Sequence, residues 1–109
     1  MPQPVKKVTD ADTELVRSRA KAWLDAHGFN DAGVEVYRKM PGSSIRVRVV
    51  HPKFTDQLIE DRDRMTLGFL RDVPEEIDRD ITLVLLLGPD ELDANFMNAE
   101  FDQPAPAYL

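Results

Sequence analysis

The chain has 109 residues and carries 14 Lys and Arg against 20 Asp and Glu, for a formal net charge of -6 at pH 7. A chain of this length usually folds as one domain around one core, without help from a metal or a disulfide. The absence of cysteine excludes disulfides, thiolate zinc sites, cysteine-held iron–sulfur clusters and cysteine nucleophiles.

No stretch of the sequence resembles a membrane span. The longest apolar run, Ile81–Leu87, is far below the roughly 20 residues that a spanning helix needs. Met1–Lys7 contains two prolines and no apolar region of the kind found in signal peptides. We therefore expect a soluble, cytoplasmic protein with no membrane partner.

The pattern predicts a first helix from about Thr9 to His27. Charged residues occupy the opposite side from the apolar ones, which recur every three to four positions at Leu15, Val16, Ala20, Trp23 and Leu24. Thr9 or Asp10 can cap its first turn, and Gly28 suits the left-handed position after its end.

A β-hairpin follows the first helix. Val34 and Val36 alternate with polar residues, and Ile45, Val47 and Val49 alternate with Arg46 and Arg48. Between the strands, Pro41-Gly42 matches the central positions of a type II turn. Pro52 cannot extend the ladder, so the second strand ends near His51.

Thr55 can cap a second helix that runs to about Asp72. Its expected inner face repeats at helical spacing and consists of Leu58, Ile59, Met65, Phe69 and Leu70. Pro74 then opens a short turn or helix.

Ile81–Leu87 is predicted to be the third strand. It shows no polar alternation, which indicates cover on both faces, by helices on one and by a partner or the C-terminal segment on the other. Asp90–Phe101 is compatible with a short helix. The element order predicts an α+β fold, α-β-β-α-(α)-β, with a mixed three-stranded sheet and helices packed on one face.

The charges are unevenly distributed. Arg38, Lys39, Arg46, Arg48 and Lys53 lie in a stretch that contains no acid, whereas residues 72–102 hold ten acids and one arginine. A cationic hairpin face would attract phosphates or acidic segments. Two structural interpretations compete with binding: the cations keep an edge strand unpaired, or they neutralise the chain's own acidic C-terminal third.

Arg62 falls in the middle of the apolar arc of the second helix. A buried guanidinium without a partner costs several kcal/mol. Arg62 therefore either ties its helix to a loop or faces a partner, while Arg64 lies on the polar side.

Signatures of catalysis are scarce. The sequence has no phosphate-binding glycine loop, no G-x-S-x-G and no H-E-x-x-H. His27 suits a helix C-terminus, His51 ends a strand, and the two lack a third metal ligand. We expect no enzyme activity, no cofactor and no metal; an enzyme that uses His51 with a nearby carboxylate is the remaining alternative.

Four segments together resemble the BolA family: Ser44–Phe54, Leu58–Met65 with its Arg62-Asp63-Arg64 motif, Asp80–Leu87 and Pro89–Leu92. The resemblance covers roughly residues 10–93. It implies a topology close to the type II KH fold and a non-enzymatic role, in which BolA-like proteins pair with monothiol glutaredoxins around a shared iron–sulfur cluster or act as DNA-binding regulators of stress response and morphology.

Two departures from the family concern its cluster ligands. The family's histidine at the start of the last strand corresponds to Thr82, and Met40–Ser44 has neither the His nor the Cys that some members carry in the hairpin loop. Imidazole or thiolate ligation is therefore missing at both places. The Gly-x-x-Gly loop of nucleic-acid-binding relatives is also absent.

These observations predict a BolA-like adaptor or regulator that acts by binding another macromolecule. The alternative is a nucleic-acid-binding module that uses the basic hairpin face. We expect residues 1–8 to be a flexible N-terminus, 9–93 a BolA-like domain, and 94–109 a short helix with a loose acidic tail. The candidate binding residues are Arg38, Lys39, Arg46, Arg48, Lys53, Arg62 and Arg64.

Overall fold

The structure is a computed structural model that describes residues 7–93 and 96–102. One mixed sheet contains β1 (Gly33–Arg38), β2 (Ile45–Val50) and β3 (Ile81–Leu87). The strand order is β1-β2-β3, with β1 antiparallel and β3 parallel to the central β2. The predicted α+β class and mixed sheet are confirmed.

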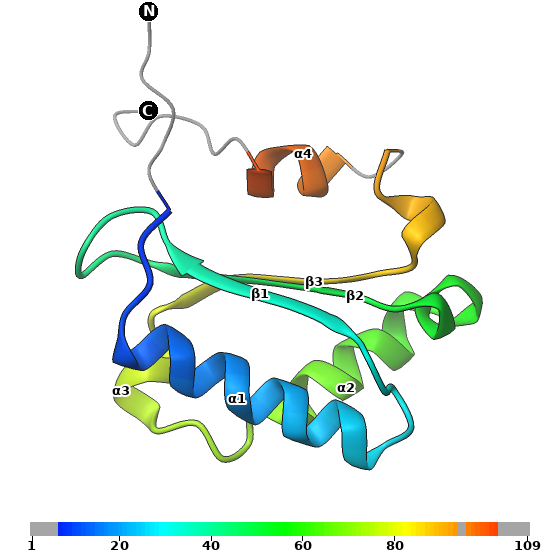
Figure 1. The fold of residues 1–109 in the computed structure, drawn as a ribbon, viewed down its shortest axis with the longest axis horizontal. Coiled ribbons are helices and arrows are strands. Elements are labelled where there is room, and N and C mark those ends of the chain that lie inside the picture. The colour runs from blue at the N-terminus through cyan, green and yellow to red at the C-terminus, as the bar shows by residue number, and fades with distance from the viewer. Residues whose placement is uncertain (1–6, 94–95, 103–109) are drawn as a thin grey trace, which may run out of the picture.

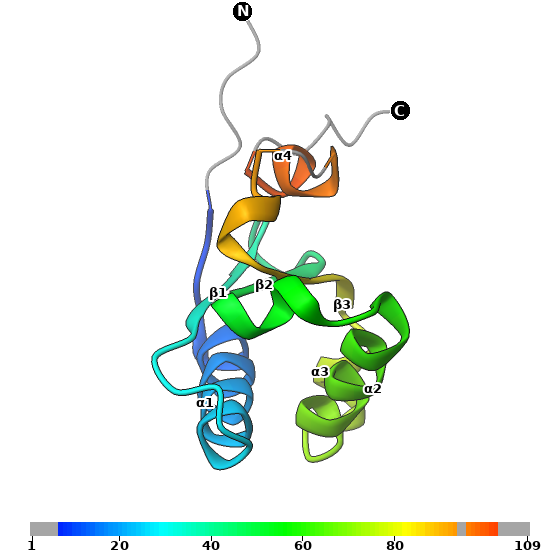
Figure 2. The same cartoon turned by 90° about the vertical axis from the view of Figure 1, so that its right-hand side faces the viewer.

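Helices form a layer on each side of this sheet. One face is covered by α1 (Ala11–Ala26), α2 (Ile59–Leu70) and the single-turn α3 (Glu75–Asp78), while the short helix α4 (Phe96–Asp102) lies over the other face (Figure 1). Helices α1 and α2 lie next to one another beneath the sheet (Figure 2). Within the described ranges, no helix is both long and apolar enough to cross a membrane.

Helix α1 begins at the predicted cap. The Asp10 carboxylate accepts a hydrogen bond from the Thr13 N–H at 2.9 Å, and the Thr13 hydroxyl accepts one from the Asp10 N–H at 2.8 Å. This reciprocal pair satisfies two donors at the helix start. Gly28, with a φ of 85°, follows the helix end as predicted.

The hairpin turn is also as predicted. Gly42 has a φ of 73°, and the Ser43 N–H donates to the Met40 carbonyl at 3.0 Å. A positive φ at this position is what a type II turn requires, and glycine adopts it without steric cost.

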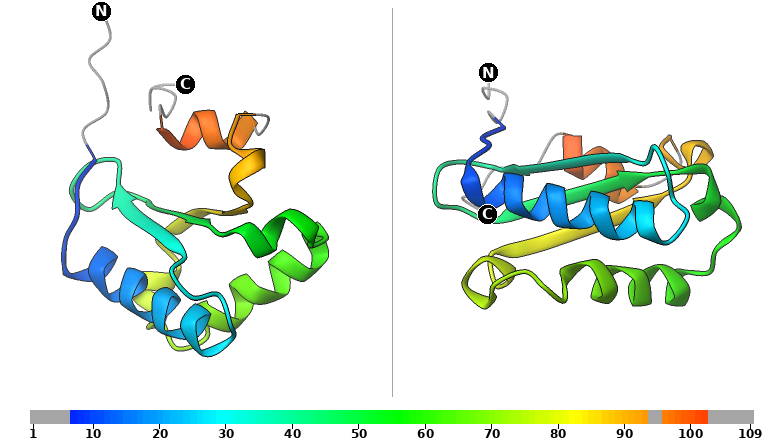
Figure 3. Two further views of the ribbon diagram at one scale, coloured as in Figure 1. Left: turned by 45° about the vertical axis from the view of Figure 1, so that its right-hand side comes forward. Right: turned by 60° about the horizontal axis from the view of Figure 1, so that its bottom comes forward.

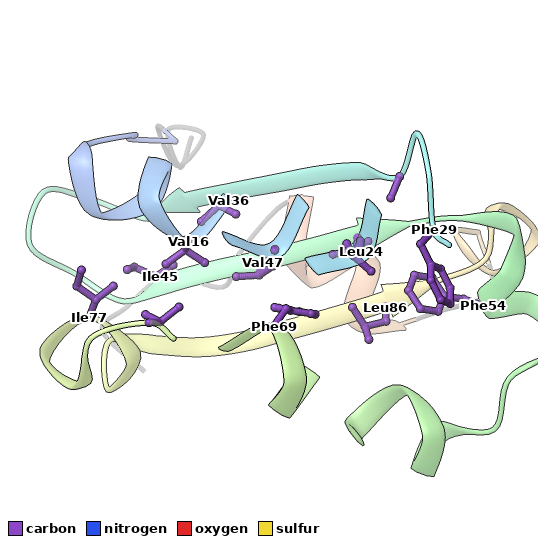
Figure 4. Packing of buried hydrophobic residues seen from close by; sticks show 14 residues of the cluster. Val16, Leu24, Phe29, Val36, Ile45, Val47, Phe54, Phe69, Ile77 and Leu86 are labelled. Carbon is purple, nitrogen blue, oxygen red and sulfur yellow. The ribbon is translucent and has the colours of Figure 1, made fainter. Parts of the chain in front are cut away.

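The main hydrophobic core lies between the sheet and the layer formed by α1, α2 and α3 (Figure 4). Strand alternation directs Val36, Val47 and Leu86 into it, and Val36 pairs with Val47 in the register of the hairpin. Strand β3 also contributes Leu85 and Leu87 to a second, smaller cluster on the opposite face. The prediction that β3 is covered on both faces is therefore confirmed, and the second cover is the C-terminal segment.

The start of the second helix was predicted wrongly. Pro52–Asp56 forms a separate 3-10 helix, η1, and α2 begins after Leu58, which provides no side-chain cap. The Thr55 hydroxyl donates instead to the Asp90 carboxylate at 2.6 Å. Leu58, the residue before α2, and Ile59, its first residue, are exposed rather than in the core.

The two ends of the chain differ from the expected boundaries. Val8, inside the N-terminus predicted to be flexible, pairs with β1: its N–H donates to the Arg38 carbonyl at 2.9 Å and its carbonyl accepts from the Arg38 N–H at 2.7 Å. Instead of one helix over Asp90–Phe101, the described residues form η2 (Pro89–Glu91) and α4. Residues 1–6 of the predicted flexible N-terminus and 103–109 of the predicted loose tail lie outside the described residues.

Candidate functional site

The outer face of the sheet is the face that does not contact the main core. Because side chains alternate along a strand, the residues between the core valines point there. The hairpin register places Tyr37 opposite Arg46 and Glu35 opposite Arg48. A phenol ring and two guanidinium groups therefore share this face with Leu83, Leu85 and Leu87 of β3.

Helix α4 covers this outer face (Figure 3). The Phe101 side chain is fully buried, and its ring meets Tyr37 edge to face with centroids 5.0 Å apart. The Arg48 guanidinium carbon lies 4.6 Å from the Phe101 centroid, and the Tyr37 hydroxyl donates to the Phe101 carbonyl. The aromatic ring of α4 is thus held between a ring and a cation.

Acidic groups neutralise both arginines of β2. The Arg46 Nη2 lies 2.6 Å from a Glu100 carboxylate oxygen. The Arg48 Nη1 lies 3.0 Å from the Asp102 carboxylate, and its Nη2 lies 2.9 Å from Glu35. The Arg48 Nη1 also donates to the Asn98 side-chain oxygen at 2.6 Å. The outer face therefore carries a network of ion pairs and hydrogen bonds in which α4 supplies most of the acceptors.

The contacts on this face shift the pKa values of Arg48, Glu35 and Tyr37. Burial lowers the pKa of Arg48, but hydrogen bonds to Asp102 and Glu35 outweigh that effect and the pKa is raised. Burial raises the pKa of Glu35, but hydrogen bonds from Lys7 and Arg48 outweigh it, so the pKa is lowered. Burial raises the pKa of Tyr37. The ion pairs and the neutral phenol are the stable forms near pH 7.

Arg38 belongs to a different cluster, at the end of β1. Its Nε lies 2.7 Å from Asp10, its Nη2 lies 2.9 Å from Asp12 and its Nη1 lies 3.3 Å from Asp80. The Nη1 also donates to the Ser43 carbonyl. Three carboxylates and a carbonyl thus surround one guanidinium, which ties α1 to the hairpin turn and to the start of β3.

Arg62 is turned inward from α2, as one of the two interpretations of the sequence required. Its Nη1 donates to the Leu86 carbonyl at 2.9 Å and its Nη2 donates to the Phe54 carbonyl. The two Nη atoms also meet the two carboxylate oxygens of Glu91, at 3.0 and 2.9 Å. The hydrogen bond from Arg62 is the main reason that the pKa of Glu91 is lowered. Arg62 therefore ties α2 to η1, β3 and η2.

The described residues do not form the expected exposed cationic face. Arg38 is 3% and Arg46 is 6% exposed, because the chain's own carboxylates surround them, and β2 is the central strand rather than an edge strand. The interpretation that the arginines neutralise the acidic C-terminal third holds for Arg46 and Arg48.

The remaining candidate cations are dispersed. Lys39 is half-buried next to the hairpin turn. The Lys53 amino group donates to the Gly28 carbonyl at 2.6 Å, at the far end of α1. The Arg64 side chain is 78% exposed and lies 3.6 Å from Asp61. The structure therefore does not gather the seven predicted residues into one site.

The residues on α4 that meet the outer face were not identified from the sequence. The sequence pattern indicated Glu100 and Asp102 only as members of the acidic C-terminal third of the chain. It indicated Phe101 only as the last residue of a predicted helix. One signal could have found Tyr37: it lies two residues from Glu35 on the predicted strand, on the side away from the valines.

The histidines have structural roles. The His51 Nδ1 accepts from the Lys53 N–H at 3.1 Å, so the other ring nitrogen, 3.0 Å from the Asn30 carbonyl, is the protonated one. His27 stacks on Trp23 with centroids 3.8 Å apart. No group of three or more His, Cys, Asp or Glu residues suited to a metal occurs in the described part of the chain.

Helix α2 presents a second surface of a different kind. Leu58, Ile59 and Leu67 are 69%, 74% and 73% exposed. Leu67 also lines a surface hollow together with Leu70, Arg71, Val73, Glu75 and Asp78. Ile59 and Leu67 are eight residues apart and therefore lie on the same side of α2, about 80° apart around its axis. We call the exposed side chains of Leu58, Ile59 and Leu67 the α2 apolar surface.

Comparison of the chain with protein-family models and with curated proteins gives no match.

Proposed function

We propose that this chain is a non-enzymatic, BolA-like adaptor that binds a protein partner through the α2 apolar surface. The observation that carries the proposal is the exposure of Ile59 and Leu67 on α2 and of Leu58 just before it. Large apolar side chains exposed to water favour burial against another molecule, at about 25 cal/mol per Å².

The charge around this surface indicates the kind of partner. Residues 56–78 contain eight acids and three arginines, a local charge of minus five. One of those arginines, Arg62, is already paired with Glu91. A partner segment with apolar side chains flanked by Lys and Arg would complement this surface in shape and charge.

Two further points support an adaptor rather than an enzyme or a nucleic-acid module. Both histidines are engaged in structural contacts, and the hairpin arginines are paired within the chain. Thr82, at the position of the family's ligand histidine, offers no imidazole. The proposal therefore includes a protein partner, a monothiol glutaredoxin being the one that the resemblance suggests, but not a shared iron–sulfur cluster.

Site-specific photo-crosslinking in the native cells tests the proposal. A photoreactive residue at position 59 or 67 should form a discrete protein adduct whose crosslinked segment is apolar and rich in Lys or Arg. The control position is Lys21, which is exposed on α1. Equal adducts at all three positions, or none at 59 and 67, would count against the α2 apolar surface.

The double variant Ile59→Ala/Leu67→Ala gives a quantitative prediction. Truncating two side chains at the centre of an interface should weaken binding of the crosslinked partner at least about tenfold. The free energy of unfolding should stay within about 0.5 kcal/mol of that of the unsubstituted chain, since both side chains are already exposed. Titration calorimetry and urea unfolding measure the two effects separately, and unchanged affinity would contradict the proposal.

A further inference from the structure

The outer face of the sheet has the composition of a binding face, yet this chain covers it with its own helix. Tyr37, Arg46 and Arg48 supply a ring and two cations. Phe101, at the C-terminal end of α4, occupies the space between them. The occupant is itself a short peptide with an aromatic residue between two acids, Glu100-Phe101-Asp102.

Helix α4 is held mainly by polar contacts. Its described side chains contribute one buried apolar group, Phe101, while Asn98, Glu100 and Asp102 contact arginines. None of the α4 side chains that the structure describes belongs to the main core on the other face of the sheet. Displacing α4 would therefore open the smaller cluster and leave the main core intact.

The fit between α4 and the face is incomplete. Glu100 meets Arg46 only through Nη2, and the buried Arg46 Nε has no hydrogen-bond partner among the described residues. An arginine binds a carboxylate most strongly through two parallel N–H donors. A carboxylate placed to accept from both Nε and Nη2 would bind this guanidinium better than Glu100 does.

The face also recognises peptide backbone. The Tyr37 hydroxyl donates to the Phe101 carbonyl, and the Arg46 Nη2 lies 3.2 Å from the Glu100 carbonyl. Nucleic acid would satisfy the cations and the ring but would offer no main-chain carbonyls. The net charge of -6 also opposes a polyanion.

We propose that α4 is an intramolecular occupant of a peptide-binding face, and that an acid–aromatic–acid segment of a partner protein displaces it. This surface is distinct from the α2 apolar surface, so either proposal can fail without the other. The attached α4 acts as a competitor at high effective concentration. The partner's apparent affinity is therefore reduced by the fraction of molecules in which α4 is closed.

The first test measures whether α4 opens by itself in the unmodified chain. Hydrogen exchange followed by mass spectrometry should show the amides of residues 98–102 exchanging well before those of β2, and faster in 0.5 M salt because ion pairs are screened. Exchange of α4 and β2 together, with no salt effect, would show that α4 is an inseparable part of the fold and would overturn the proposal.

The second test measures binding in trans. A full-length Glu100→Gln/Phe101→Ala variant loosens α4, and the probe is a fluorescent peptide with the sequence of residues 96–102. The probe should bind the variant at least tenfold more tightly than the unsubstituted chain. A scrambled peptide of the same composition, the matched control, should bind neither.

Every other outcome of this binding test overturns the proposal. Equal binding of the probe to both proteins places it elsewhere on the surface. Binding of a single-stranded oligonucleotide but not of the peptide assigns the face to phosphates. If circular dichroism shows that the variant has lost cooperative unfolding, α4 is a structural element and not a displaceable occupant.

Discussion

Arg62 shows how one charged residue on an apolar helix arc is accommodated. The guanidinium satisfies the carbonyls of Phe54 and Leu86 and the carboxylate of Glu91. These acceptors lie on η1, β3 and η2, so a single side chain connects α2 to all three elements near the C-terminal end of β3. The sequence predicted that Arg62 needs a partner, but it could not name acceptors that are 8, 24 and 29 residues away.

Arg62→Met tests this role. The variant keeps the aliphatic stem but leaves Glu91 and two carbonyls without their donor. Breaking a buried ion pair costs about 3–5 kcal/mol, and the partial exposure of Glu91 reduces this to roughly 2–3 kcal/mol. Urea unfolding measures this loss in the free energy of unfolding. The control is Arg64→Met at an exposed position, whose free energy of unfolding should stay within about 0.5 kcal/mol of that of the unsubstituted chain. Equal stabilities of the two variants would show that Arg62 is not a tether.

At the scale of elements, the contact between α1 and α2 depends on the absence of a side chain. A Cβ at Gly68 would lie 2.5 Å from Cζ2 and 2.8 Å from Cε2 of Trp23. The indole ring packs there against α2, stacks on His27 and meets the edge of Phe69. Glycine in the last turn of α2 thus permits an approach that any larger residue would prevent.

Gly68→Ala should therefore destabilise the protein although alanine is the better helix former. The gain in helix propensity is about 1 kcal/mol, and the forced displacement of a packed indole costs roughly 1–3 kcal/mol. We expect a net loss of up to about 2 kcal/mol with a shift of Trp23 fluorescence. Leu67→Ala, one residue away and exposed, is the control; a more stable Gly68→Ala protein with unchanged fluorescence would contradict the close approach.

At the scale of the whole molecule, local sequence patterns predicted the fold, whereas contacts between distant residues determine which charged side chains are exposed. Strand alternation, the Pro41-Gly42 turn and the Asp10 cap depend on neighbouring residues, so the fold class followed from the sequence. The candidate site did not, because Arg46 and Glu100 are 54 residues apart. Nothing local specifies that α4 returns to the sheet, and the positive run therefore looked like an exposed surface.

The same pairing predicts how stability depends on pH. Three carboxyl groups have lowered pKa values: those of Asp10, Glu35 and Glu91. The main cause is a hydrogen bond from the Thr13 N–H for Asp10 and from the Arg62 side chain for Glu91. For Glu35, burial raises the pKa, but hydrogen bonds from Lys7 and Arg48 outweigh it. A carboxyl whose pKa is lower in the folded state stabilises the fold above its unfolded pKa, and this contribution is lost as the pH falls through the folded value. The melting temperature should therefore be nearly constant from pH 6 to 8 and fall once the pH drops below the ordinary carboxyl pKa.

A matched variant separates this effect from general acid denaturation. Glu91→Gln removes one of the three groups, so its melting temperature should be lower than that of the unsubstituted chain at pH 7, and the difference should shrink as the pH falls through the folded pKa of Glu91. Differential scanning calorimetry at several pH values measures both curves. A difference that stays constant down to acid pH would mean that the Arg62–Glu91 pair stabilises the protein through packing rather than charge.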